Sequence, residues 1–170
     1  MTPDGMTRLA SPYTVRDTID RVAAAASASG MSIFARIDHA SAAAAVGLPM
    51  RPAELLIFGS ACVATPIMQV APTAALDLPL KALAWQDEDG ATWLGFNNLV
   101  WIANRHFLDD EQDMVDTMAV GLFRVMHEAI CTRDHAGTAE ANLCACEPEV
   151  VMLTVPAAVR PIIEQKVPVS

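Results

Sequence analysis

The sequence is poor in aromatic residues, in lysine and in long hydrophobic runs. Aromatic side chains make up 5% of the 170 residues and only two residues are lysine, whereas thirty are alanine. No stretch approaches the roughly 18 uninterrupted apolar residues of a membrane-spanning helix, and the first ten residues do not resemble a signal peptide. Four cysteines are too few for a disulfide scaffold. We therefore expect a cytoplasmic protein with reduced thiols and no membrane partner.

The residues that are present indicate a folded, acidic protein whose charge is unevenly spread. A hydrophobic fraction of 53% excludes a disordered chain, and the net charge of −9 argues against a nucleic-acid partner. Residues 1–106 carry 9 acidic and 7 basic side chains, whereas residues 107–170 carry 11 and 4. This change predicts a core over residues 1–106 and a C-terminal extension over residues 107–170.

Hydrophobic periodicity predicts that helices and strands alternate in the core. Between Met31 and Asp38 apolar side chains alternate with others, which is typical of a strand. The segments Leu80–Gln86 and Thr92–Phe96 flank a turn ending in Gly90 and predict a hairpin. The other expected elements are a helix from Thr14 or Asp17 to about Ser29, a helix at 40–46, a strand at 54–58, a helix beginning at Thr65-Pro66 and a helix at 98–106. This pattern predicts an α+β fold of two layers, an antiparallel or mixed sheet with helices mainly on one face.

The extension begins with an amphipathic helix expected from about residue 111 to 132. Its apolar stripe must be covered, so we expect it to pack on the core or at a dimer interface. A polar loop and a short strand at Val150–Val155 are expected to follow. The high apolar content of so short a chain also favours a homodimer.

Several motifs occur in the order found in one family. They include Phe34-Ala35-Arg36-Ile37-Asp38-His39-Ala40, Ile57-Phe58-Gly59, Ala75-Leu76-Asp77-Leu78-Pro79-Leu80-Lys81, Asp89-Gly90 and Arg105-His106. Over roughly residues 9–106 the chain resembles the domain-of-unknown-function family DUF302. The resemblance implies a compact α+β domain that tends to dimerise, with no established reaction. Ser60-Ala61 stands where the family commonly has Asn-Pro, so a family role for that turn is in doubt here.

A first candidate site lies at the end of the strand at 31–38. Arg36 offers a planar donor fork for a carboxylate or phosphate. Asp38 can hold the guanidinium of Arg36 in place or orient His39, which follows at the end of the strand. With Thr65 and Met68 from the helix that begins at Thr65-Pro66, these residues are the expected binding site for an anionic or amphipathic small molecule. The alternative, which spacing alone favours, is a structural Arg–Asp pair with a histidine, His39, that caps the following helix.

A second candidate site is a metal centre in the extension. His127 and Cys131 are four residues apart on the polar side of the expected helix, and Cys144 and Cys146 follow. Thiolates and imidazoles are ligands of zinc or another transition metal, although this spacing is irregular. The alternative is an exposed helix with incidental His and Cys side chains.

Three functions follow from these candidates. The first is a small-molecule-binding or sensor-like dimeric domain that uses Arg36. The second is a metal- or redox-linked protein built on the C-terminal His and Cys residues. The third is an enzyme with His39 as a general base, which has no direct support because no catalytic sequence motif occurs.

Overall fold

The fold is described by a computed structural model in which residues 2–131 are placed. Five antiparallel strands form one open sheet in the order β1-β5-β4-β3-β2. The strands are β1 (Met6–Ser11), β2 (Ser32–Asp38), β3 (Ala53–Gly59), β4 (Leu80–Gln86) and β5 (Thr92–Asn97). The helices are α1 (Val15–Ala28), α2 (His39–Ala45), α3 (Ala61–Val70), α4 (Leu99–Arg105) and α5 (Gln112–Ile130), with short 3-10 helices η1 (Pro72–Leu76) and η2 (Asp109–Glu111). The predicted α+β class and helix-covered sheet are confirmed.

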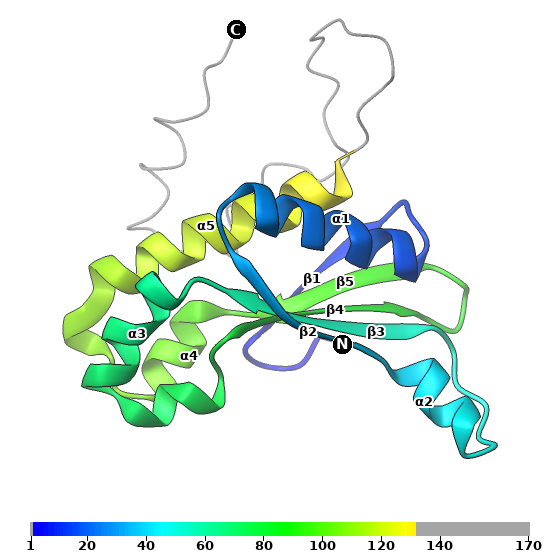
Figure 1. Cartoon of the computed structure of the whole chain (residues 1–170), viewed down its shortest axis with the longest axis horizontal. Coiled ribbons are helices and arrows are strands. Elements are labelled where there is room, and N and C mark those ends of the chain that lie inside the picture. Colours follow the sequence, from blue (N-terminus) through cyan, green and yellow to red (C-terminus); the bar gives the residue numbers. More distant parts are fainter. Residues whose placement is uncertain (1, 132–170) are drawn as a thin grey trace, which may run out of the picture. The chain divides into compact units, whose positions relative to one another are not determined.

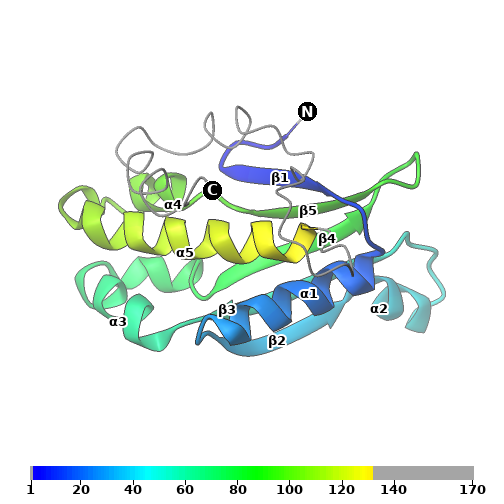
Figure 2. The same cartoon turned by 90° about the horizontal axis from the view of Figure 1, so that it is seen from above.

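The helices are divided between one face of the sheet and its two ends. Helices α1 and α5 lie side by side over one face, α3 and α4 lie beyond one end, and α2 lies beyond the other (Figures 1 and 2). The core fills the space between the sheet and the two long helices. Its largest fully buried side chains include Ile19, Leu56, Phe58, Leu94, Met126 and Ile130.

Local sequence explains most element boundaries. The hydroxyl of Thr14 accepts a hydrogen bond from the backbone N–H of Asp17 and caps α1, and Gly30 adopts a φ of 76° beyond its end. The carboxylate of Asp87 accepts hydrogen bonds from the backbone N–H groups of Asp89 and Ala91 and shapes the β4–β5 turn. These boundaries agree with the predicted ones.

Three features differ from the prediction. Strand β1 was not expected. Helix α3 begins at Ala61, four residues before the predicted start, with Pro66 inside it. Pro66 has no N–H to donate, so the helical hydrogen bond to the carbonyl four residues earlier is missing there. The predicted alternation of Met31, Ile33, Ala35 and Ile37 is interrupted by a bulge between Ile33 and Ala35, which adds one residue to β2.

Helix α5 packs against α1 within one compact unit that ends at Ile130. The predicted apolar stripe of α5 is buried, with Val115, Met118, Leu122, Met126, Ala129 and Ile130 among its buried residues. The chain therefore divides later than the boundary expected near residue 107. The predicted strand at Val150–Val155 lies outside the described residues. Among residues 2–131, no helix is long and apolar enough to cross a membrane.

Candidate functional site

A cavity of about 420 Å³ opens beside the end of the sheet where α3 lies. It is bounded by the beginning of β2, by α3, by the segment that leads into β4 and by α5. Its apolar lining includes Met31, Phe34, Met68, Pro79, Leu80 and Met118. Its polar lining residues are Ser29, Ser60, Thr65 and Thr117, and none of the described lining residues carries a charge. We call this space the α3–α5 cavity.

Small residues and the bulge leave this space open. Phe34 is the extra residue of the bulge in β2, between the Ile33–Phe58 and Ala35–Ile57 pairs, and it lines the cavity. Gly59 and Gly121 line the cavity without side chains to fill it. A Cβ atom added at Gly121 would lie 3.7 Å from the Met31 Cε atom, an ordinary contact distance. The cavity therefore follows from missing side-chain volume in β3 and α5.

The structure brings together two of the five residues predicted to bind a small molecule. Thr65 and Met68 line the α3–α5 cavity, whereas Arg36, Asp38 and His39 are not among its lining residues.

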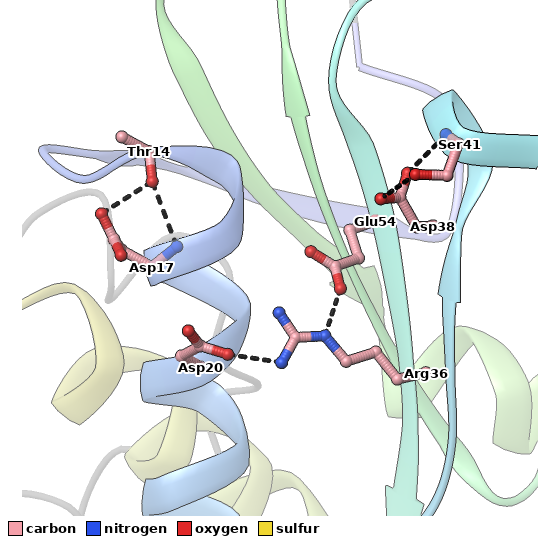
Figure 3. A network of polar contacts seen from close by, with 7 residues as sticks. All are labelled: Thr14, Asp17, Asp20, Arg36, Asp38, Ser41 and Glu54. Atoms are coloured by element: carbon pink, nitrogen blue, oxygen red, sulfur yellow. Dashed lines mark hydrogen bonds and ion pairs between the residues drawn. The ribbon is translucent and has the colours of Figure 1, made fainter. Parts of the chain in front are cut away.

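Arg36 is engaged by two carboxylates of neighbouring elements. Its Nε atom donates to Glu54 of β3, and its Nη1 atom donates to Asp20 of α1 (Figure 3). The hydrogen bond to Glu54, followed by the weaker effect of Asp20, raises the pKa of Arg36 above its usual value. Two carboxylates around one guanidinium leave a net negative charge, which opposes a further anion. The geometry is that of a structural ion-pair cluster joining α1, β2 and β3.

Asp38 is the N-cap of α2, a role that the alternative interpretation had given to the next residue. Its carboxylate accepts hydrogen bonds from the Ser41 N–H at 2.8 Å and the Ser41 hydroxyl at 2.7 Å (Figure 3). These bonds lower the pKa of Asp38 below its usual value. His39 is the first residue of α2. The polar groups at this strand end therefore serve the start of a helix.

The predicted metal ligands are only partly within the described structure. His127 lies in the last turn of α5 and Cys131 follows that helix directly. Cys144 and Cys146 lie outside the described residues. Within residues 2–131 no three His, Cys, Asp or Glu side chains are grouped closely enough to hold a metal ion. The zinc site stays a prediction.

A polar cluster that was not predicted joins η1 to the end of α4. The His106 Nε2 atom lies 2.7 Å from the Asp77 Oδ2 atom, and the His106 Nδ1 atom lies 3.0 Å from the Thr73 hydroxyl. Asp77 and His106 are buried, whereas Thr73 is exposed. A carboxylate only accepts, so Nε2 carries a proton, and Nδ1 of a neutral ring then accepts the Thr73 hydroxyl proton. The three groups form a chain from the core to the surface.

Two cations hold the carboxylate end of this cluster. The Arg105 Nη1 atom lies 3.2 Å from the Asp77 Oδ2 atom. The ammonium group of Lys81 donates to the backbone carbonyls of Asp77 at 2.9 Å and Pro79 at 3.2 Å. The segment that leads into β4 is thereby fixed, and it also lines the α3–α5 cavity through Leu78, Pro79 and Leu80.

The sequence contained a signal for this cluster. Asp77 and Lys81 lie in one of the motifs that carry the family resemblance, and Arg105 and His106 form another. The spacing of 29 residues between Asp77 and His106 belongs to no catalytic motif, so their contact could not be derived from the sequence.

A family comparison agrees with this arrangement of motifs. The profile of the family described as "Domain of unknown function DUF302" matches residues 7–128. The fold also resembles the crystal structure of an uncharacterized conserved DUF302 protein from Bacillus stearothermophilus, with a TM-score of 0.67 and 14% identity. That match covers 75% of this chain and 99% of the other. Because the identity is only 14%, the match shows the fold alone.

Curated relatives carry a different name. Over 118 residues, or 69% of its length, the chain is 42% identical to "Fluoride-specific ion channel FluC 1" of Brucella suis biovar 1 (strain 1330). The identity and length are the same for "Fluoride-specific ion channel FluC 2" of Brucella melitensis biotype 1 (strain ATCC 23456 / CCUG 17765 / NCTC 10094 / 16M). The chain spans 46% and 44% of these two relatives. The channel name therefore belongs to proteins more than twice as long as the matched region.

Proposed function

The chain belongs to the DUF302 family, which has no established reaction, and from its cavity we propose that it binds a small, mostly apolar molecule. The observation that carries the proposal is the α3–α5 cavity of about 420 Å³, which lies within the usual size range of ligand pockets. Apolar walls with a few hydroxyl groups are typical of such pockets.

The lining indicates the chemical class of the ligand. Burial of a charged group without a partner is costly, and the described lining offers hydroxyls but no charged side chain. A neutral or amphipathic molecule therefore fits better than a strongly anionic one. Thr65 can donate to or accept from its polar atoms, whereas the Thr117 hydroxyl, which donates to the Asp113 carbonyl at 2.8 Å, can only accept.

Helix α3 provides a way for the ligand to enter. Ile67 is its only buried residue, and Pro66 lacks the N–H that would continue the helical hydrogen bonds. An element with so little burial moves at low free-energy cost. The wall of the cavity formed by α3 is thus the part that opens most easily.

The test is a pair of substitutions at Gly121, with N-phenyl-1-naphthylamine as a neutral fluorescent probe. We expect saturable binding to the wild-type chain. In Gly121→Leu the added side chain occupies the cavity, and the affinity should fall at least about tenfold, or 1.4 kcal/mol. Gly121→Ala adds only a Cβ atom, which the structure accommodates, and should bind as the wild type does. Unchanged binding in a folded Gly121→Leu, or no saturable binding to the wild type, would contradict the proposal.

We also propose that a second copy of the chain covers the sheet face opposite α1 and α5. Leu55, Ile57, Leu83, Trp85 and Trp93 alternate with buried core residues and are half-buried, and they form neighbouring cross-strand pairs such as Leu55–Leu83 and Trp85–Trp93. Exposed apolar patches of this kind mark interfaces. A two-fold dimer would cover this face by bringing the same face of both copies together.

Light scattering during size-exclusion chromatography tests the dimer. The wild type should have a mass of twice 18.1 kDa, and Leu83→Lys should have the mass of one chain. Val46→Lys is the matched control, because Val46 is the C-cap of α2, away from this face, with 71% of its surface exposed. A single-chain mass for the wild type at tens of micromolar concentration would refute the dimer. The expected cytoplasmic location stays a prediction.

A further inference from the structure

From the cluster at the end of α4 we infer a second, chemical activity: Thr73 is a nucleophile activated by His106 for acyl transfer from small carboxylic esters. An exposed hydroxyl, a buried imidazole and a buried carboxylate stand in line, with contacts of 3.0 Å and 2.7 Å. Both lengths are within the range expected for a nucleophile with its base and for a base with the group that orients it. This site is separate from the α3–α5 cavity, whose lining does not include Thr73.

The roles follow from the hydrogen bonds. Asp77 accepts from the His106 Nε2–H group and fixes the tautomer in which Nδ1 is free to take a proton. In this neutral tautomer the Thr73 hydroxyl is the donor to Nδ1. Compared with the Ser–His–Asp arrangement of serine proteases, the two ring nitrogens have exchanged partners, but the sequence of hydroxyl, imidazole and carboxylate is the same.

The surroundings favour acyl transfer over phosphoryl transfer. Phosphoryl transfer needs positive charge directed at the transferred group. The two nearby cations, Lys81 and Arg105, are instead directed at the backbone and side chain of Asp77. Attack on an ester carbonyl develops a single negative charge on one oxygen, which neutral hydrogen-bond donors can stabilise without a cation.

Exposed apolar side chains beside the cluster indicate a substrate with an apolar acyl group. Leu76 follows Thr73 by three residues in a 3-10 helix, so both lie on the same side of η1. Phe107 directly follows His106, and 87% of its surface is exposed. Its φ of 56° is unusual for a residue other than glycine, and such strain concentrates at functional sites. A short aliphatic acyl group is therefore the expected substrate moiety.

The reaction balances in two steps. The Thr73 oxygen bonds to the ester carbonyl carbon as its proton passes to His106 Nδ1, and the bond from that carbon to the alcohol oxygen breaks. The departing alkoxide takes the proton from His106 and leaves as the alcohol. Water then attacks the acyl-threonine with His106 as base, which releases the carboxylic acid and restores the Thr73 hydroxyl.

The experiment uses the full chain with p-nitrophenyl butyrate. We expect release of p-nitrophenol and, after acid quenching, a butyryl group on the peptide that contains Thr73. Thr73→Val should lower the rate at least about 100-fold and remove the label, whereas Thr73→Ser should retain both. Thr2→Val, at an exposed threonine outside the cluster, controls for unspecific acylation and hydrolysis and should leave the rate unchanged.

Thr73→Val decides the outcome because Thr73 is exposed and its replacement leaves the core intact. His106→Gln should lose both activity and label, and its folding is checked by circular dichroism. A merely structural Thr73–His106 contact predicts no acyl label on Thr73 and equal rates in wild type and Thr73→Val. Either result overturns the inference.

Discussion

The two ends of the sheet use polar side chains in opposite ways. At the end where α2 lies, Asp38 bonds to Ser41 and Asp87 bonds to Ala91, so each partner is only a few residues away. At the end where α3 and α4 lie, Asp77 bonds to His106, which is 29 residues away, and His106 bonds to Thr73 across 33 residues. Local bonds shape a turn or a helix start. Long-range hydrogen bonds join separate segments. Here they also connect a hydroxyl, an imidazole and a carboxylate, which are groups capable of catalysis.

The largest expected difference between the ends comes from removing one aspartate at each. Asp77→Ala leaves Arg105 and His106 without their shared carboxylate, and the free energy of unfolding should fall by about 3 kcal/mol, since breaking a buried pair costs that much. Asp87→Ala loses two exposed bonds within its own turn and one part-buried bond from the Trp93 ring, none of them to a charged partner, and should cost clearly less. Urea unfolding of both variants measures the difference. Equal losses would show that the long-range cluster is no more important to stability than the turn.

Arg36 lies between the two ends and separates a structural role from a binding role. Arg36→Ala removes the partner of Glu54, whose side chain is only 11% exposed, and should lower the free energy of unfolding by about 2 kcal/mol. Binding of N-phenyl-1-naphthylamine should not change, because Arg36 does not line the cavity. Loss of probe binding with unchanged stability would restore the predicted binding role of Arg36.

Two glycines with positive φ test how tightly each end is packed. A Cβ atom added at Gly5 would lie 2.4 Å from the Trp101 ring of α4, whereas at Gly90 the nearest side-chain atom is at 4.0 Å. Both substitutions by alanine incur backbone strain of about 1 kcal/mol. Gly5→Ala must also displace the ring, so it should cost about 1 kcal/mol more than Gly90→Ala. Tryptophan fluorescence should change in Gly5→Ala only, and a change in both variants would argue against this packing.

The same contrast explains how much of the molecule the sequence could predict. The hairpin around Gly90 and the helix capped by Asn98 were predictable because each depends on residues within a few positions. The bulge at Phe34 was not, since a periodic pattern gives no sign of one extra residue. Pro66 suggested a helix start because the sequence does not show how many turns precede it.

The candidate sites followed the same rule. Thr65 and Met68 line the cavity as residues of α3, which follows Gly59 closely in the chain. Local sequence was therefore enough to single them out. Arg36 was assigned to an anion because Asp20 and Glu54, its partners from α1 and β3, were unknown until the fold was known. The Thr73–His106–Asp77 cluster needs η1 and α4 to meet, which no spacing in the chain expresses.

The smallest expected effect is acid sensitivity at the end where α2 lies. Hydrogen bonds, from the Ser41 backbone N–H at Asp38 and from the Trp93 ring at Asp87, lower the pKa of both carboxyl groups in the folded chain below the usual 3.8. The unfolded chain therefore takes up protons first as the pH falls, so the contribution of both groups to stability is present above pH 3.8 and is lost as the pH falls through the folded pKa values. The double variant Asp38→Asn with Asp87→Asn should lose less thermal stability between pH 5 and pH 3 than the wild type, and Asp4→Asn controls for loss of a carboxylate elsewhere. Equal losses in the double variant and the wild type would place the acid-sensitive interactions outside these local turns, and the long-range cluster at the other end would be the next to test.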